Sequence, residues 1–342
     1  MLEYIVKRTG LALLTLLIIV AVSYFLLRLA PGDPTKTNSI MSSDQNAGNI
    51  NSDKSELAGN SAMRKKLHLD EPIYIGFALW MKDALLHGDL GDSATVDPGR
   101  PVVDVILERL PVTLSLNILA ILLTYTVAIP LGIFSALKPG GKFDRIESIV
   151  LFMLYSLPTI WTALVMQSLL CQGGKLSIFP LKGLDIGDTS LMTTWEIMGS
   201  YFMHYCLPVA CLSYAGLAGL SRYARTGMIE VIRQDYIRTA RAKGLSEFYV
   251  IFKHALRNSL ITLITLFAGL LPGLIAGSII IENVFSIAGM GSLSLLALNS
   301  RDYPLQMALF TFGGALTLGG ILLSDILYKV VDPRITFSGK KL

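Results

Sequence analysis

Residues 235–262 read DYIRTARAKGLSEFYVIFKHALRNSLIT and form a basic island between long apolar segments. Six Arg, Lys and His side chains stand in this island against only two acidic ones, Asp235 and Glu247. The flanking segments, Tyr201–Leu220 and Leu260–Ile281, are long enough to cross a bilayer, which takes about 20 mostly apolar residues. A charged loop between two such spans is typical of the cytoplasmic face of a membrane protein. This alternation predicts an all-α polytopic membrane protein with a cytoplasmic loop available to a partner.

The composition of the whole chain favours the same class. Of its 342 residues, 52% are hydrophobic and 16% are charged, whereas soluble domains average about 25% charged residues. The net charge of +4 is modest, so we expect no nucleic-acid partner. The three cysteines form no CxxC pair and the four histidines show no metal-ligand spacing, so we expect no metal site.

Six stretches have the length and apolarity of membrane spans. They are Thr9–Leu29, Val112–Leu137, Ile149–Leu170, Tyr201–Leu220, Leu260–Ile281 and Leu305–Leu327. The first follows Lys7 and Arg8 as a signal peptide would, but no small-x-small cleavage site follows it, so we interpret it as an uncleaved span. With six spans, the basic residues of the short loops fall on one side, which predicts that both termini are cytoplasmic.

The spans divide the chain into three parts. Residues 1–30 form the first transmembrane helix, residues 31–111 an extracellular segment, and residues 112–342 a core of five spans that carries a cytoplasmic loop at 222–257. Within the extracellular segment, Asn38–Asn60 is poor in apolar residues and predicts a mobile loop. The remainder predicts a helix over Ser61–His87, interrupted at Pro72, and a short amphipathic helix over Val102–Leu110 at the membrane surface.

Several functional classes are disfavoured by what the spans lack. No charged residue lies in the central part of a predicted span, which argues against an ion-coupled secondary carrier and against an intramembrane metalloprotease. The chain also has no GxxxxGK[ST] motif, so it cannot hold nucleotide phosphates in a P-loop. If transport is driven by ATP, the ATPase must therefore be another chain, and this one is not an enzyme. A stand-alone carrier, and a scaffold or sensor of extracellular peptide, remain as alternatives.

The basic island itself predicts a helical hairpin. Met228–Lys243 has helical character, Gly244 is a natural helix stop, and Ser246 can cap a second helix that begins at Glu247. Ala240 and Gly244 are four residues apart and would share one helix face. Since that face lacks bulk, we expect another backbone to approach it closely.

This loop resembles the cytoplasmic loop of ABC-importer permeases. The stretch Arg238-Thr239-Ala240-Arg241-Ala242-Lys243-Gly244 is similar to the form written by the peptide-permease branch, and His254-Ala255-Leu256-Arg257-Asn258 extends the similarity, although Thr262 stands where that branch usually has proline. The resemblance covers nearly the whole chain. It includes Leu29–Pro34, Gly88–Gly91, Arg109–Leu114, Ile281–Ser286, Arg301–Pro304 and Asp332–Arg334, and it points to the first permease subunit of oligopeptide or dipeptide importers.

The resemblance implies the type I importer permease fold, with about six spans in a bacterial or archaeal plasma membrane. It implies as partners a second, homologous permease, two ABC ATPases that bind ATP and Mg, and an extracellular peptide-binding protein, with no cofactor on this chain. It also implies that the loop couples ATPase closure to alternating access. The residues concerned are Arg238, Thr239, Ala240, Arg241, Lys243, Gly244, Glu247 and Arg257.

The substrate would then be a peptide, and the pore would be lined by weakly binding small or polar groups. Candidates are Ser213, Ser278, Asn283 and Ser286. A neighbouring branch of the same architecture carries nickel chelates or glutathione, and the sequence leaves these substrates open as alternatives.

Overall fold

The computed structural model describes residues 2–29, 70–181, 192–259, 270–274 and 277–331, with isolated positions between 183 and 190. These parts of the chain are almost wholly helical, and their only extended pairings are two isolated bridges, Asp92–Pro101 and Cys171–Phe179. The chain divides into two compact units, the first formed by residues 1–112 and 289–319 and the second by residues 113–288 and 320–342. The loop expected at Asn38–Asn60 lies outside the described residues.

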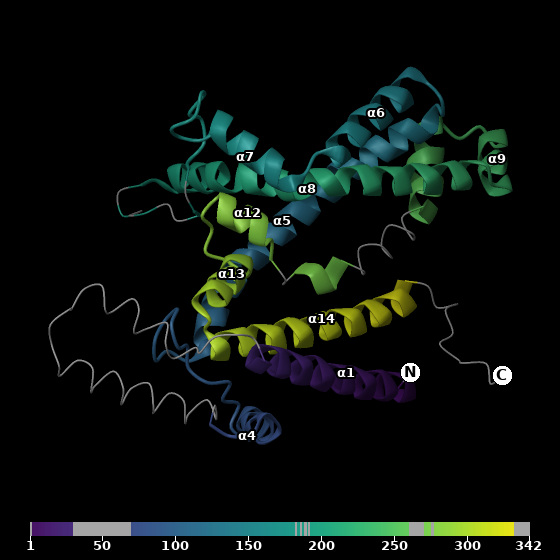
Figure 1. The fold of residues 1–342 in the computed structure, drawn as a ribbon. Coiled ribbons are helices and arrows are strands. Elements are labelled where there is room, and N and C mark those ends of the chain that lie inside the picture. The colour runs from purple at the N-terminus through teal and green to yellow at the C-terminus, as the bar shows by residue number, and fades with distance from the viewer. Residues whose placement is uncertain are drawn as a thin grey trace. The chain divides into compact units, whose positions relative to one another are not determined.

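The first unit gathers helices from both ends of the chain. Its elements are α1 (Leu2–Leu29), α4 (Ile73–Leu86), the first turns of α5 (Val102–Leu137), α13 (Met290–Ser300) and most of α14 (Tyr303–Val331) (Figure 1). Pro72 stands immediately before α4, where its missing N–H leaves no helical bond unmade. One apolar core joins α1, α4 and α14 around Val20, Tyr24 and Met307.

A second core in this unit corrects the expectation of a surface helix at Val102–Leu110. Residues 102–137 form one continuous helix of 36 residues, and Val102 and Ile106 are fully buried against α13 and α14. Pro111 lies inside this helix, but a proline removes only one backbone hydrogen bond. Packing of the preceding turns outweighs that loss, so this stretch is the first part of α5, and its apolar face packs on α13 and α14.

The second unit contains the remaining helices. They are the rest of α5, α6 (Lys142–Ser156), α7 (Thr159–Leu170), α8 (Thr194–Ile232), α9 (Asp235–Ala242), α10 (Glu247–Tyr249), a π-helical turn η1 (Val250–Ala255), a 3₁₀ turn η2 (Leu271–Leu274) and α12 (Ile279–Val284). Both α6 and α7 contact α8, and Figure 1 shows each of them inclined to α8, with α9 at the end of α8.

Four described helices are long and apolar enough to span a membrane: α1, α5, α8 and α14. A fifth candidate is the pair α6 and α7, which bends by 94° at the break that holds Leu157 and Pro158. The expected span Ile149–Leu170 is therefore broken rather than straight. Much of the expected span Leu260–Ile281 lies outside the described residues, and its described end is not a continuous α-helix.

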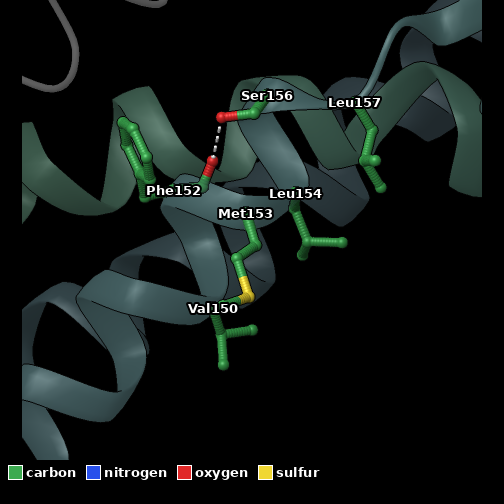
Figure 2. A pocket seen from close by; sticks show the side chains of 6 residues that line it. All are labelled: Val150, Phe152, Met153, Leu154, Ser156 and Leu157. Carbon is green, nitrogen blue, oxygen red and sulfur yellow. Dashed lines mark hydrogen bonds between the residues drawn. The ribbon is translucent and has the colours of Figure 1, made fainter.

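The end of α6 presents an apolar surface at this bend. A pocket of about 520 Å³ lies there. Figure 2 shows its lining side chains, which are Val150, Phe152, Met153, Leu154, Ser156 and Leu157. The hydroxyl of Ser156 donates to the Phe152 carbonyl at 2.8 Å, so this polar group is satisfied within the helix. Apolar side chains, and a hydroxyl bonded within its own helix, are compatible with exposure to the hydrocarbon core of a membrane.

Close packing of α5 on α8 depends on Gly132. A Cβ at this position would stand 2.5 Å from the Ser221 carbonyl oxygen and 2.6 Å from the Ala224 Cβ. We expect Gly132→Ala to push the two helices apart and to destabilise the protein by about 1–3 kcal/mol. The measurement is the apparent melting temperature of the purified protein in detergent.

The matched control for Gly132→Ala is Gly219→Ala in α8. No described atom lies within 4 Å of the Cβ position at Gly219, and alanine is the better helix former, so this change should be neutral or slightly stabilising. Equal melting temperatures for Gly132→Ala and the wild type would show that the helix contact is looser than described.

Candidate functional site

The basic island folds as a compact hairpin at the end of α8. The long helix stops at Ile232, and α9 begins three residues later at Asp235, so the expected single helix over Met228–Lys243 is broken at Arg233 and Gln234. The predicted cap is confirmed: the Ser246 hydroxyl accepts a hydrogen bond from the Tyr249 N–H at 3.4 Å. The helix that follows is irregular, with α10 running directly into the π-helical turn η1.

The predicted stop at Gly244 is confirmed, and its geometry shows why glycine stands there. The Leu245 N–H donates to the Ala240 carbonyl, and the Gly244 N–H donates to the Arg241 carbonyl at 2.9 Å. This is the Schellman pattern, which needs a left-handed residue just past the helix end. Gly244 supplies it with φ of +77°.

A two-point ion pair closes the hairpin across this turn. Arg241 Nε donates to Glu247 Oε1 at 2.7 Å, and Arg241 Nη2 donates to Glu247 Oε2 at 3.2 Å. The two side chains are partly exposed, so the pair adds little stability but sets the direction of α10 relative to α9. The Asn258 amide also donates to the Tyr236 hydroxyl at 2.9 Å, which ties the far end of the hairpin back to α9.

The inner face of the hairpin corrects the expected small-residue face. Ile237 is fully buried and Ala240 is 7% exposed, and both pack within the chain against Met228 of α8 and apolar residues of α5 and η1. Gly244 is exposed and lies beyond the helix end. Ala240 and Gly244 therefore do not share an open face, because apolar groups from sequence-distant helices cover the alanine.

The outer face carries the exposed residues. Of the residues predicted to couple, Arg238, Thr239, Arg241, Lys243, Glu247 and Arg257 are all exposed there. Sequence reasoning missed the aromatic side chains beside them. Phe248 is 71% exposed and Phe252 is 42% exposed, and their ring centroids are 4.5 Å apart. Lys253 lies 4.6 Å from the centre of the Tyr249 ring, so cationic and aromatic groups are interleaved on this surface.

A second group of predicted residues surrounds α12, in the same unit. The Gln167 amide of α7 donates to the Val284 carbonyl of α12 at 2.6 Å. The preceding turn η2 is held separately, because the Asn117 amide of α5 donates to the Leu274 carbonyl at 2.6 Å. Glu282 is 2% exposed and accepts a hydrogen bond from the Thr113 hydroxyl at 3.2 Å. These hydrogen bonds come from polar residues that lie within the apolar stretches of α5 and α7. That pattern was the feature of the sequence from which such contacts could have been predicted.

The four predicted pore residues occupy different surroundings. Asn283 and Ser286 are exposed on or just after α12, and Ser278 caps the start of that helix by accepting from the Ile281 N–H. Ser213 is 2% exposed, and its hydroxyl donates to the carbonyls of Val209 and Ala120 between α8 and α5. Three of the four therefore lie on or next to α12, whereas Ser213 is buried between α8 and α5. Backbone groups engage the side chains of Ser213, Ser278 and also Asn283, whose amide donates to the Ile279 carbonyl at 3.1 Å.

Comparison with known proteins identifies the family of this chain. Residues 128–337 match the family described as the binding-protein-dependent transport system inner membrane component, and residues 1–117 match the N-terminal region of such components. The chain belongs to this family. As an inner membrane component it is a membrane protein, and its similar proteins are described as permeases.

Similar proteins are permeases of the same family over their full length. The oligopeptide transport system permease protein AppB of Bacillus subtilis is 36% identical, covering 98% of this chain and 100% of AppB. The dipeptide transport system permease protein DppB of Lactococcus lactis is 33% identical, covering 98% and 99%. The peptidoglycan transport system permease protein YejB of Agrobacterium fabrum is 30% identical, covering 98% of each chain.

A solved structure supports the fold of this inner membrane component. The inward-facing MetNI methionine ABC transporter contains a chain that matches with a TM-score of 0.51 at 15% identity, covering 67% of this chain and 97% of that one. The predicted all-α ABC importer permease fold is thereby confirmed.

The first unit of this inner membrane component contains a buried carboxylate that sequence reasoning did not assign. Asp302 is fully buried at the start of α14 and accepts hydrogen bonds from the Ser93 hydroxyl at 2.5 Å and from the N–H groups of Ala94, Thr95 and Val96 at 2.9–3.1 Å. Its other oxygen accepts from the Leu305 N–H at 3.2 Å. One side chain thus holds the loop before α5 and caps α14.

The turn at Gly244 supports a prediction on the hairpin. No described atom lies within 4 Å of the Cβ position, so Gly244→Ala meets only backbone strain, which we expect to destabilise the closed turn by about 1–2 kcal/mol. Gly244→Asn should destabilise it less, because asparagine tolerates the left-handed conformation. Hydrogen exchange of the Gly244 and Leu245 amides measures the difference, and equal protection in both variants would contradict the turn geometry.

Proposed function

We propose that this chain is the first permease subunit of an ATP-driven peptide importer. It forms half of a translocation pore, and its hairpin couples closure of the ATPases to alternating access. The single observation that carries the coupling role is the hairpin itself. Its base is packed into the ends of α5 and α8 through Met228 and Ile237, while its outer face exposes cationic and aromatic groups to a partner.

The proposed complex needs several other chains. Because this sequence has no P-loop, ATP and Mg would be bound by two ABC ATPases that receive the hairpins, and this chain itself would carry no cofactor. A homologous second permease would complete the pore, and an extracellular peptide-binding protein would deliver the substrate. The basic loops support an orientation with both termini in the cytoplasm of a bacterial or archaeal cell.

Docking on the ATPase would involve two parts of the hairpin. At the turn, the exposed charges belong to Arg238 and Lys243, and the exposed backbone belongs to Gly244. Beside the turn, an apolar area is presented by Phe248 and Phe252. Buried aromatic anchors ringed by charged groups are the usual source of affinity in protein interfaces. Ala240 would contribute indirectly, because it is buried and holds α9 against the apolar residues at the base of the hairpin.

Peptide is the substrate best supported among the alternatives. The similar permeases named above carry oligopeptide, dipeptide and peptidoglycan in their descriptions, and neither nickel nor glutathione appears among them. The exposed Asn283 and Ser286 beside α12 would offer polar, weakly binding groups to a peptide backbone.

The test is uptake of a labelled tetrapeptide into proteoliposomes that contain this chain with its genomic neighbours. We expect uptake that requires both ATP and the ATPases. Uptake that persists without the ATPases would establish a stand-alone carrier, and peptide binding without accumulation would favour a sensor. Preferred uptake of labelled glutathione or a nickel chelate would overturn peptide as the substrate.

A further inference from the structure

A buried polar network joins three helices of the second unit near the hairpin. It consists of Ser135 of α5, Asp144 and Glu147 of α6, and Ser221 and Arg225 of α8. The two serines are fully buried, and Asp144 and Glu147 are 5% and 8% exposed. Buried charges of this kind require specific partners, so their placement is a feature of the fold that needs explanation.

Asp144 is the centre of the network. Arg225 Nε donates to Asp144 Oδ1 at 2.7 Å and Arg225 Nη2 donates to Asp144 Oδ2 at 2.8 Å, which makes a two-point ion pair between α6 and α8. The Ser135 hydroxyl of α5 and the Gly140 N–H, at 2.7 Å, also donate to this carboxylate. One side chain of α6 is thereby held by both neighbouring helices.

Glu147 repeats the link one turn further along α6. Its Oε1 accepts from the Ser221 hydroxyl of α8 at 2.6 Å. Ser221 and Arg225 are themselves one turn apart on α8, so two successive turns of α6 are bound to two successive turns of α8. Such a double link, which includes a two-point Arg–carboxylate pair of defined geometry, fixes both the axial register and the rotation of one helix on the other.

The network lies between the hairpin and the segment that carries the predicted pore residues. Toward the hairpin, α8 continues from Arg225 through the buried Met228 to its end at Ile232, where α9 follows almost at once. In the other direction, α6 bends into α7, whose Gln167 amide holds the Val284 carbonyl of α12. Contacts are thus continuous from the hairpin through α8, α6 and α7 to α12.

We propose that Asp144 and Arg225 are positioning residues that transmit movement of the hairpin from α8 to α6, so that α6 follows α8 when the ATPases close. The inference rests on the proposed function of the hairpin. A buried ion pair adds little net stability compared with a neutral pair of similar size, so its presence here is better explained by the defined geometry that it imposes.

The decisive variant is the neutral pair Asp144→Asn with Arg225→Gln. It removes both charges of the pair together with the two-point link, and Glu147 keeps its hydrogen bond from the Ser221 hydroxyl, so the complex should still assemble. We expect the ratio of ATP hydrolysed to tetrapeptide transported to rise about threefold or more. Arg225→Lys keeps the charge but loses the two-point geometry, and it should shift the ratio in the same direction by less.

The matched control is Arg145→Gln, which removes one positive charge from an exposed position next to Asp144 and should leave the ratio unchanged. A wild-type ratio in both the neutral pair and Arg225→Lys would overturn the proposal, because a merely structural contact would affect only yield or melting temperature.

A second measurement is independent of the transported substrate. Spin labels at Ile149 of α6 and Tyr223 of α8 stand at positions that are 54% and 55% exposed. In the wild-type complex, we expect the distance between them to be the same in nucleotide-free and ATP-bound states, since the helices move together. In the neutral pair it should change on ATP binding, and an unchanged distance would contradict the proposal. Absence of ATP-dependent tetrapeptide uptake in the wild type would count against the proposed function alone.

Discussion

Asp302→Ala should destabilise the first unit by about 3 kcal/mol or more. The substitution removes the acceptor for the Ser93 hydroxyl, for three consecutive N–H groups of the loop at 94–96, and for the N–H of Leu305. Each buried donor left without a partner destabilises by about 1–3 kcal/mol, and relaxation of the loop toward water recovers part of that sum. The apparent melting temperature of the purified protein and its yield in membranes measure the effect.

The control is Asp302→Asn, which keeps the size of the side chain and one oxygen acceptor. It should retain either the loop contacts or the helix cap, and its loss of stability should be clearly smaller than that of alanine. If Asp302→Ala melts like the wild type, the carboxylate does not organise the loop. If both variants are equally unstable, the negative charge rather than the hydrogen-bond geometry is what matters.

Replacing both aromatic residues of the outer hairpin face, Phe248→Ala with Phe252→Ala, should weaken retention of the ATPases by about tenfold or more. The two rings contact each other at a tilt of 35°, and Phe248 is 71% exposed. Truncation of a buried aromatic anchor typically weakens a complex by about 2 kcal/mol or more. The dissociation constant of the ATPases from the purified permease measures the effect. Folding should be unaffected, because neither ring belongs to the buried cluster at the hairpin base.

The matched control for this pair is Phe202→Ala. Phe202 is 65% exposed on the same unit but lies near the start of α8, far along the helix from the hairpin. It should leave ATPase affinity unchanged. Wild-type affinity in the double variant would show that the partner contacts the charged turn around Lys243 and not the aromatic face.

Features set by neighbouring residues were predictable from the sequence. The stop at Gly244 and the cap at Ser246 follow from local backbone chemistry, and both were expected where they occur. The apolar lengths of α1, α5, α8 and α14 likewise identified spans. Each of these features can be predicted from a short stretch of sequence, without knowing which residues pack against it.

Features set by distant residues were not predictable in the same way. Ala240 was expected to be open, but Met228 and residues of α5 cover it. Asp302 is bound to residues about 209 positions earlier in the chain, and the role of Asp144 depends on Arg225, which is 81 positions away. Hydropathy and helix propensity carry no information about such pairings, so no structural role could be assigned to Asp144 or Asp302 from the sequence.

The π-helical turn at Val250–Ala255 makes the number of residues in the hairpin as important as their identity. A π turn holds one residue more than an α turn, and every side chain after it is rotated accordingly. Deleting or inserting a single residue between Gly244 and Leu256 would turn everything downstream by about 100°, carrying the apolar side of this segment away from the base on which it packs. The hairpin should therefore accept many substitutions on its outer face while rejecting any change of length.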